Sequence, residues 1–148
     1  MIDITSNPID PNRITARVKT DSNGAVLTFL GVTRNYSGDR KVLHLEYEAY
    51  RPMADKKLEQ IVEEVHHRWD TIDVAIVHRI GRVFIGEISL IVAVSSPHRK
   101  SVFYACQYAV DLVKTMVPIW KKEFFEGGEV WIESSTDLKA ISMQSLKK

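Results

Sequence analysis

Three lysines surround a proline and a tryptophan in the segment KTMVPIWKKE, residues 114–123. Lys114 falls in the last turn of a predicted amphipathic helix, which Pro118 prevents from continuing. Lys121 and Lys122 follow directly after this break. Two or three ammonium groups could therefore converge, where they would attract an anion or exchange protons. Apolar residues at three- and four-residue steps predict the buried stripe of that helix: Val102, Phe103, Cys106, Ala109, Val110, Val113 and Val117.

The same lysine also has a purely structural interpretation. Lysine is favoured in the last turn of any helix, where it meets exposed carbonyls and the negative end of the helix dipole. Asp111 could pair with Lys114 across one turn. Further anion-binding signals must therefore decide between the two interpretations.

One such signal is the segment SSPHR, residues 95–99, between an apolar strand and the same helix. Ser96 is predicted as the N-cap, and Pro97 fits the first helical position. His98 and Arg99 in the first turn oppose the usual preference for acidic residues there. A bound phosphate would compensate their positive charge, so we expect an anion at this helix end. Alternatively, Arg99 pairs with a distant carboxylate and His98 lies on the surface.

A third signal follows the first long predicted strand, GAVLTFLGVTR, residues 24–34. Arg34 stands at the mouth of this strand, and its guanidinium is a permanently charged fork suited to phosphate oxygens. We expect Arg40 and Lys41, beyond the following turn, only to solvate an edge. Arg34 is therefore the better candidate for binding an anion.

Helix geometry limits how these groups combine. His98 and Lys114 are separated by about 24 Å along a continuous helix, which is too far for one small-molecule pocket. If both serve one site, a second copy of the chain must bring His98 and Arg99 to Lys114 and Lys121 of the first. The sequence therefore predicts a homodimer with shared sites.

Several blocks, in order, resemble the large catalytic subunit of molybdopterin synthase. The resemblance covers roughly residues 24–131 and rests on five segments: GAVLTFLGVTR, LEYEAYRPMA, HRIG, SSPHR and VPIWKKE. It implies conversion of cyclic pyranopterin monophosphate, also called precursor Z, into molybdopterin by two sulfur transfers. It also implies a partner, a small ubiquitin-like subunit whose C-terminal thiocarboxylate supplies the sulfur. A homodimer of the large subunit would form the core of a heterotetramer.

The resemblance also assigns roles to residues of this chain. The lysines matching the catalytic positions of the family are Lys114 and Lys121. The basic residues matching its substrate-binding positions are Arg34, His98 and Arg99, the last two reaching the site from the other protomer. The remaining residues expected to line the pocket are Val32, Thr33, Lys122 and Glu123.

The chemistry of clustered lysines agrees with these roles. Cations relieve the negative charge that develops when thiocarboxylate sulfur adds to a phosphate-bearing substrate. Lysines crowded by other cations hold their protons less tightly, which suits acid or base catalysis near neutral pH. A lysine amine could also be acylated transiently by the C-terminus of the partner. Two other functions stay open: a noncatalytic anchor for the tail of such a partner, and an unrelated phosphate-binding enzyme or sensor.

Cysteine and histidine usage gives no sign of metal or thiol chemistry. The single cysteine, Cys106, lies on the apolar stripe and is expected in the core rather than as a sulfur relay. His66 and His67 are adjacent on a predicted helix, so they face different directions and are expected on the surface. We expect no metal and no cofactor.

Length and charge suit one cytoplasmic domain, residues 1–148, with a sizeable core. The net charge of +1 argues against a general nucleic-acid binder. The N-terminus lacks the features of a signal peptide, and no apolar run reaches the length needed to span a membrane. Residues 135–148 are expected to form a mobile tail. This tail has no arginine, unlike that of some family members, which puts its role at the phosphate site in doubt.

The element pattern predicts an α+β fold, and the resemblance implies an α/β hammerhead with a small additional antiparallel sheet. Strands 24–33 and 42–50 are expected to form a hairpin closed by the loop 35–39. Gly81 and Gly86 are expected to bracket a turn. The remaining predicted elements are strands 2–4, 71–80 and 88–95, helices 10–19, 53–69 and 97–117, and a hairpin that turns at residues 127–128.

Overall fold

The computed structural model describes residues 1–132, and the predicted mobile tail, residues 135–148, lies outside them. The predicted α+β class is confirmed, because the described residues mix helices with two sheets. In chain order the elements are β1 (Ile2–Thr5), α1 (Pro11–Val18), β2 (Ala25–Val32), β3 (Tyr36–Ser37), β4 (Arg40–Ala49), α2 (Arg51–Arg68), β5 (Asp73–Arg79), β6 (Gly81–Phe84), β7 (Ile88–Ser96), α3 (Arg99–Met116), β8 (Ile119–Phe125) and β9 (Gly128–Ile132).

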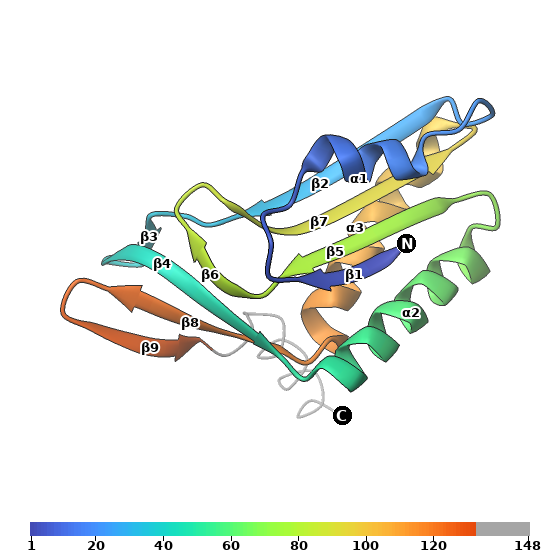
Figure 1. The fold of residues 1–148 in the computed structure, drawn as a ribbon. Helices are drawn as coiled ribbons and strands as arrows, with labels where there is room; N and C mark the ends of the chain where they lie inside the picture. The colour runs from blue at the N-terminus through green and yellow to red at the C-terminus, as the bar shows by residue number, and fades with distance from the viewer. Residues whose placement is uncertain (133–148) are drawn as a thin grey trace, which may run out of the picture.

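The first sheet has the strand order β1-β5-β7-β2 and is covered by helices on both faces. α1 packs on one face, whereas α2 and α3 lie side by side on the other (Figure 1). Because both faces are covered, the central strands β5 and β7 are buried almost throughout and read as continuous apolar runs. Through β7 and β2, this sheet provides the surface on which α3 packs.

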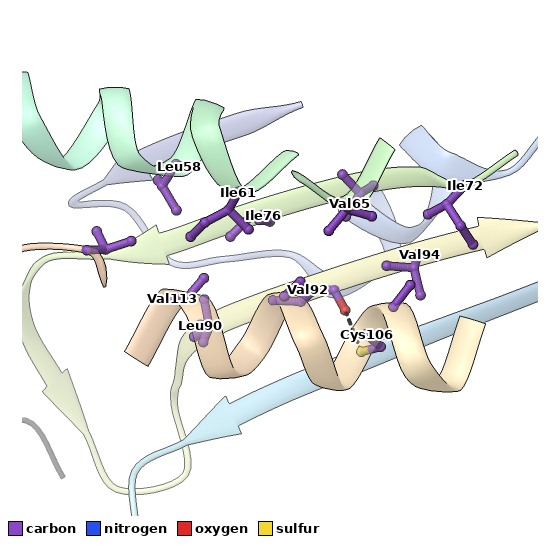
Figure 2. Packing of buried hydrophobic residues seen from close by; sticks show 14 of the residues in the cluster. Leu58, Ile61, Val65, Ile72, Ile76, Leu90, Val92, Val94, Cys106 and Val113 are labelled. Atoms are coloured by element: carbon purple, nitrogen blue, oxygen red, sulfur yellow. Dashed lines mark hydrogen bonds between the residues drawn. The ribbon is translucent and has the colours of Figure 1, made fainter. Parts of the chain in front are cut away.

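The alternation of side chains along β5 and β7 divides the core into two layers. Ile76 and Val92 face α2 and α3, as Figure 2 shows, whereas Ala75 and Ile91 face α1. Cys106 lies in the layer under α3, where its thiol approaches the Val92 carbonyl at 4.0 Å. The prediction that Cys106 is a core residue is confirmed.

The second sheet projects from one end of the first and has the strand order β3-β4-β8-β9, with β6 also paired to β4 (Figure 1). β8 and β9 form the hairpin that the Gly-Gly pair predicts, with Phe125 opposite Gly128. Because β8 follows the end of α3 almost directly, it keeps Lys121 close to the last turn of that helix.

The predicted hairpin between residues 24–33 and 42–50 is wrong. β2 pairs with β7, and β4 pairs with β8 and β6, so the two strands belong to different sheets. The turn-rich segment between them closes on β4 itself, through Tyr36 opposite Lys41 and Ser37 opposite Arg40. Strand neighbours along the chain are common hairpin partners, but long-range pairing with the buried strand β7 determined the position of β2.

The segment between Gly81 and Gly86 is also more than the predicted turn. Its first half is strand β6, in which Gly81 pairs with Tyr47 and Val83 with Leu45 of β4. The tight turn comes only at Gly86, whose φ of 80° favours glycine. β6 therefore links the end of β5 to the second sheet.

The start of α3 differs from the prediction by two residues. Ser96 is the last residue of β7, pairs with Ala25 and is buried, so it does not cap the helix. His98 occupies the N-cap position and makes no side-chain capping hydrogen bond. Because Ser96 pairs with Ala25 of β2, strand β7 extends through Ser96. The helix therefore begins later than the capping pattern predicted.

Other helix predictions are confirmed. Asp10 caps α1, since its carboxylate accepts a hydrogen bond from the Asn12 amide at 3.0 Å. Most of the predicted stripe of α3 is buried or half-buried, but Phe103 is 59% exposed and does not belong to the core. Among residues 1–132, no helix is long and apolar enough to cross a membrane.

Candidate functional site

A cavity of about 60 Å³ lies where the end of α3 meets both sheets. Apolar groups from the end of α3 and the start of β8 form one part of its wall, and ionisable or polar groups form the rest. Its lining residues are Tyr47, His78, Val113, Lys114, Val117, Ile119 and Lys121. Two of the predicted site residues, Lys114 and Lys121, thus meet at one cavity.

Different elements position these two lysines. Lys114 lies in the last turn of α3, directly after the buried Val113, so it stands at the edge of the core. Lys121 lies on β8 opposite Tyr47 of β4. The break at Pro118 ends the helix and starts the strand within three residues of Met116, which is why both lysines reach the same place.

The environment of Lys121 disfavours its charged form. Burial is the main reason that its pKa lies below the usual lysine value, and the positive charges of Lys114 and Arg34 lower this pKa further. Glu123 acts in the opposite direction. A lysine with a lowered pKa exchanges protons closer to neutral pH, which is the property required of an acid or base catalyst.

Lys122 and Glu123 face opposite sides of the second sheet, as alternation along β8 requires. Lys122 forms an ion pair with Glu129 at 2.8 Å and lies over the Trp131 ring, away from the cavity. Glu123 shares the face of Lys121 and is 3% exposed. The structure therefore places Glu123, but not Lys122, on the cavity side of a single chain.

The partner of Glu123 corrects another expectation. Arg40 was expected only to solvate an edge, but its Nε donates to Glu123 Oε1 at 3.0 Å. The pair joins the start of β4 to β8 and compensates the charge of a buried carboxylate. Arg40 thus supports the strand that carries Lys121.

Arg34 follows the end of β2 and is exposed. Its charge contributes to the lowered pKa of Lys121, so the guanidinium lies within electrostatic range of the cavity. Val32 is half exposed, whereas Thr33 is buried and exchanges backbone hydrogen bonds with Gly86 and Glu87. The Thr33 hydroxyl has no partner among residues 1–132. The segment that follows β2 therefore lies close to Lys121, as the sequence predicted.

His98 and Arg99 lie at the opposite end of α3. Both are exposed, and no carboxylate in the described part of the chain pairs with either. Arg99 and Lys114 are fifteen helical steps apart, or about 22 Å. One chain therefore does not bring these two groups of predicted site residues together.

Two cavity residues, His78 and Tyr47, were not predicted as site residues. His78 lies on β5, on the face that also carries Val74 and Ile76, and only 5% of it is exposed. Burial lowers its pKa to about 4, with a further contribution from Lys114, against a backbone hydrogen bond that raises it. Burial also raises the pKa of Tyr47. The detectable signal was a histidine on the inward face of an otherwise apolar strand.

Metal-ion chemistry has no obvious ligand set here. Within residues 1–132, no group of three or more His, Cys, Asp or Glu side chains could hold a metal ion. Burial raises the pKa of the Cys106 thiol to about 11, so little reactive thiolate forms at neutral pH. The two lysines at the cavity are groups that can exchange protons and bind negative charge.

The fold is that of a small α+β protein with a cavity, lined in part by two lysines, at the junction of two sheets. The chain belongs to the MoaE family, because the family model "MoaE protein" matches residues 4–116. It is 44% identical over 138 residues to the molybdopterin synthase catalytic subunit of Bacillus subtilis, covering 93% of this chain and 88% of the relative. It is 45% identical over 130 residues to that of Staphylococcus carnosus, covering 88% and 87%.

Solved structures show the same fold. The crystal structure of molybdopterin synthase from Staphylococcus aureus superposes with a TM-score of 0.85 at 43% identity, covering 88% of this chain and 95% of that one. A complex of subunits 1 and 2 of the molybdopterin-converting factor of Helicobacter pylori matches with a TM-score of 0.71 at 18% identity, covering 89% and 90%. At that identity the second likeness concerns the fold alone.

Proposed function

We propose that this chain is the catalytic subunit of a molybdopterin synthase, a cytoplasmic sulfurtransferase of molybdenum-cofactor biosynthesis. It converts cyclic pyranopterin monophosphate into molybdopterin by two sulfur transfers from the thiocarboxylated C-terminus of a small ubiquitin-like subunit. The observation that carries the proposal is the meeting of Lys114 and Lys121, from different elements, at one cavity beside Arg34. The names of the relatives support the same activity.

The two lysines suit the chemistry of this transfer. Lys121, with its lowered pKa, gives or takes a proton as sulfur adds to the pterin. Lys114 and Arg34 stabilise the negative charge that develops on the adduct and the substrate phosphate. A transient acyl link between a lysine amine and the partner's C-terminus is a variant of this mechanism that uses the same residues.

The size of the cavity supports delivery of sulfur on a narrow chain end. Pockets that enclose a whole small molecule typically measure about 300–1,000 Å³. The cavity of about 60 Å³ is far smaller, and its walls combine apolar and cationic groups. A C-terminal Gly-Gly thiocarboxylate is slender and negatively charged, so it fits such a cavity, whereas the pterin would lie at the mouth beside Arg34.

A second copy of the chain completes this site in our proposal. A two-fold axis beside Gln107, near the middle of α3, would place His98 and Arg99 of one copy beside the last turn of α3 in the other. An apolar groove between β2 and α3, lined in part by Leu27, Phe103 and Gln107, lies along this path. Phe103 is 59% exposed in the single chain. This homodimer would be the core of the heterotetramer.

The direct test is mass spectrometry of cyclic pyranopterin monophosphate after incubation with this protein and a thiocarboxylated ubiquitin-like small subunit. The proposal predicts a dithiolene pterin that carries two added sulfurs. A partner that binds without any conversion would favour the noncatalytic anchor instead. Binding of the pterin phosphate and a lack of response to any thiocarboxylated partner would favour an unrelated phosphate-binding protein.

Separate Lys114→Ala and Lys121→Ala variants distinguish catalysis from anchoring. An enzyme loses conversion but largely keeps the complex with its partner, because these lysines contribute more to the transition state than to docking. An anchor that uses the lysines for docking loses the complex itself. Size-exclusion chromatography of each variant with the small subunit measures the difference.

A further inference from the structure

His78 lines the cavity, and one of its two ring nitrogens already makes a hydrogen bond. Its Nδ1 is 2.8 Å from the backbone carbonyl oxygen of Arg79. A carbonyl oxygen can only accept, so this contact requires a proton on Nδ1. In a neutral ring, Nε2 then carries the unshared electron pair. The backbone therefore fixes the tautomer of His78.

The surroundings keep the ring neutral. Tyr47 of β4 packs edge-on against it, with 5.1 Å between ring centroids, and the ring is almost fully buried. The cationic groups at the same cavity are Lys114 of α3 and Lys121 of β8. The guanidinium of the neighbouring Arg79 is held by Glu87 at 3.0 Å. Burial and the Lys114 charge lower the pKa of His78 to about 4, so the ring is neutral and only weakly basic at neutral pH.

We infer that His78 is a positioning residue, whose Nε2 is the hydrogen-bond acceptor that directs the Lys114 ammonium into the cavity. The ring reaches the cavity with Nδ1 occupied, so Nε2 is the polar atom it can offer there. An ammonium group has only donors, and a neutral imidazole nitrogen is a suitable acceptor. The inference depends on the proposed function only for the role of Lys114.

A crossed pair of substitutions tests this inference. In His78→Asn, the side-chain amide reaches the Nδ1 position and can still donate to the Arg79 carbonyl, but nothing replaces Nε2. In His78→Gln, the amide reaches the Nε2 position, and its oxygen can accept from Lys114 although the bond to Arg79 is lost. A packing role for His78 would make the two variants behave alike or favour the Asn variant.

The first readout is the pKa of Lys114, measured by NMR titration of its Cε and Nζ resonances and assigned with a Lys114→Arg variant. Loss of an acceptor for the ammonium lowers this pKa, so we expect a decrease in the Asn variant and a value close to wild type in the Gln variant. This measurement needs no substrate, so it decides the inference even if the proposed function fails. Equal values in wild type and the Asn variant would overturn it.

The second readout is conversion by the complete complex with the small subunit. The expected result is a fall in kcat of about tenfold in the Asn variant, with KM nearly unchanged, because one hydrogen bond that orients a charged group is lost. The Gln variant should retain most of the wild-type kcat. Equal losses in both folded variants would show that His78 acts through packing alone, which would overturn the inference. His66→Asn, on the exposed face of α2, is the control.

Discussion

The two ends of α3 both carry cations, but their surroundings differ. At the C-terminal end, Lys114 lines a cavity together with Lys121 and His78, and the core closes behind them. At the N-terminal end, His98 and Arg99 are exposed, and His98 caps the helix without a side-chain hydrogen bond. We call the C-terminal end of α3, which lines the cavity, the constructed end. We call the N-terminal end, whose cations are exposed, the open end.

In our proposal, this difference corresponds to a division of function along the helix. The groups that must exchange protons need burial and neighbouring charges, and a single chain supplies these at the C-terminal end. Groups that only bind a phosphate need charge and access, which the N-terminal end offers. Because about 22 Å separates the two ends, our account requires a second copy to unite them.

The largest effect is expected from Lys121→Ala at the constructed end. Loss of the acid or base group should lower kcat by at least about a hundredfold, because general acid–base catalysis contributes about 10²–10⁴. Lys56→Ala, on the exposed side of α2, is the matched control and should leave conversion unchanged. Steady-state kinetics with the thiocarboxylated partner measure both. A Lys121→Ala enzyme with near-normal kcat would remove Lys121 from the mechanism.

A smaller, different effect is expected from Arg99→Ala at the open end. This change should raise KM for the pterin phosphate by about tenfold or more, which corresponds to loss of a charge-assisted hydrogen bond. The thermal midpoint should not change, because the Arg99 side chain is exposed and pairs with no carboxylate in residues 1–132. Arg13→Ala on α1 is the control. A large loss of stability would mean that this end is structural.

Stability should depend more on the partly buried Arg40–Glu123 pair in the strands next to the cavity than on an exposed pair in the same sheet. Arg40→Ala leaves the buried Glu123 carboxylate without its partner at 3.0 Å, at an expected cost of about 2 kcal/mol in the free energy of unfolding. Arg82→Ala breaks an exposed pair with Glu46 at 3.6 Å and should cost less than about 1 kcal/mol. Urea unfolding of both variants gives the comparison. Equal costs would contradict the role assigned to the Arg40–Glu123 pair.

The smallest expected effect is on the free energy of unfolding. It arises because burial makes the charged form of Lys121 unfavourable in the folded chain. Its pKa is lower in the folded chain than the usual 10.5, so the unfolded chain binds more protons between these two values. The wild type should therefore gain stability relative to Lys121→Met as pH rises through this window. Lys121→Met should be slightly more stable than the wild type at pH 7. Thermal unfolding at several pH values measures this, and a pH-independent difference would argue against a lowered pKa.

The sequence predicted the positions of those candidate residues whose placement depends on local signals. The apolar stripe and Pro118 placed the end of α3, and Lys114 lies in its last turn as expected. The positions of Arg34 and Lys121 beside that turn also agree with the interpretation of the strand mouth and the helix break.

The missed features depend on pairing between distant residues. Arg40 and Glu123 are 83 positions apart and meet only because β4 pairs with β8. His78 reaches the cavity because β5 pairs with β7, the strand on which α3 packs, and no local pattern shows this pairing. The wrong hairpin between residues 24–33 and 42–50 has the same origin, since turn signals do not reveal which strand lies next in a sheet.

The central claim, that the two ends of α3 form one site across two copies, has a direct test. Lys114→Ala and Arg99→Ala chains are purified separately, dissociated, mixed in equal amounts and reassembled with the small subunit. Random pairing makes about half of the dimers mixed, and each mixed dimer has one intact site of two. With the pterin phosphate well below the wild-type KM, where Arg99→Ala is slow, about a quarter of wild-type activity should return. Activity in the mixture no higher than the average of the two variants alone would contradict a shared site.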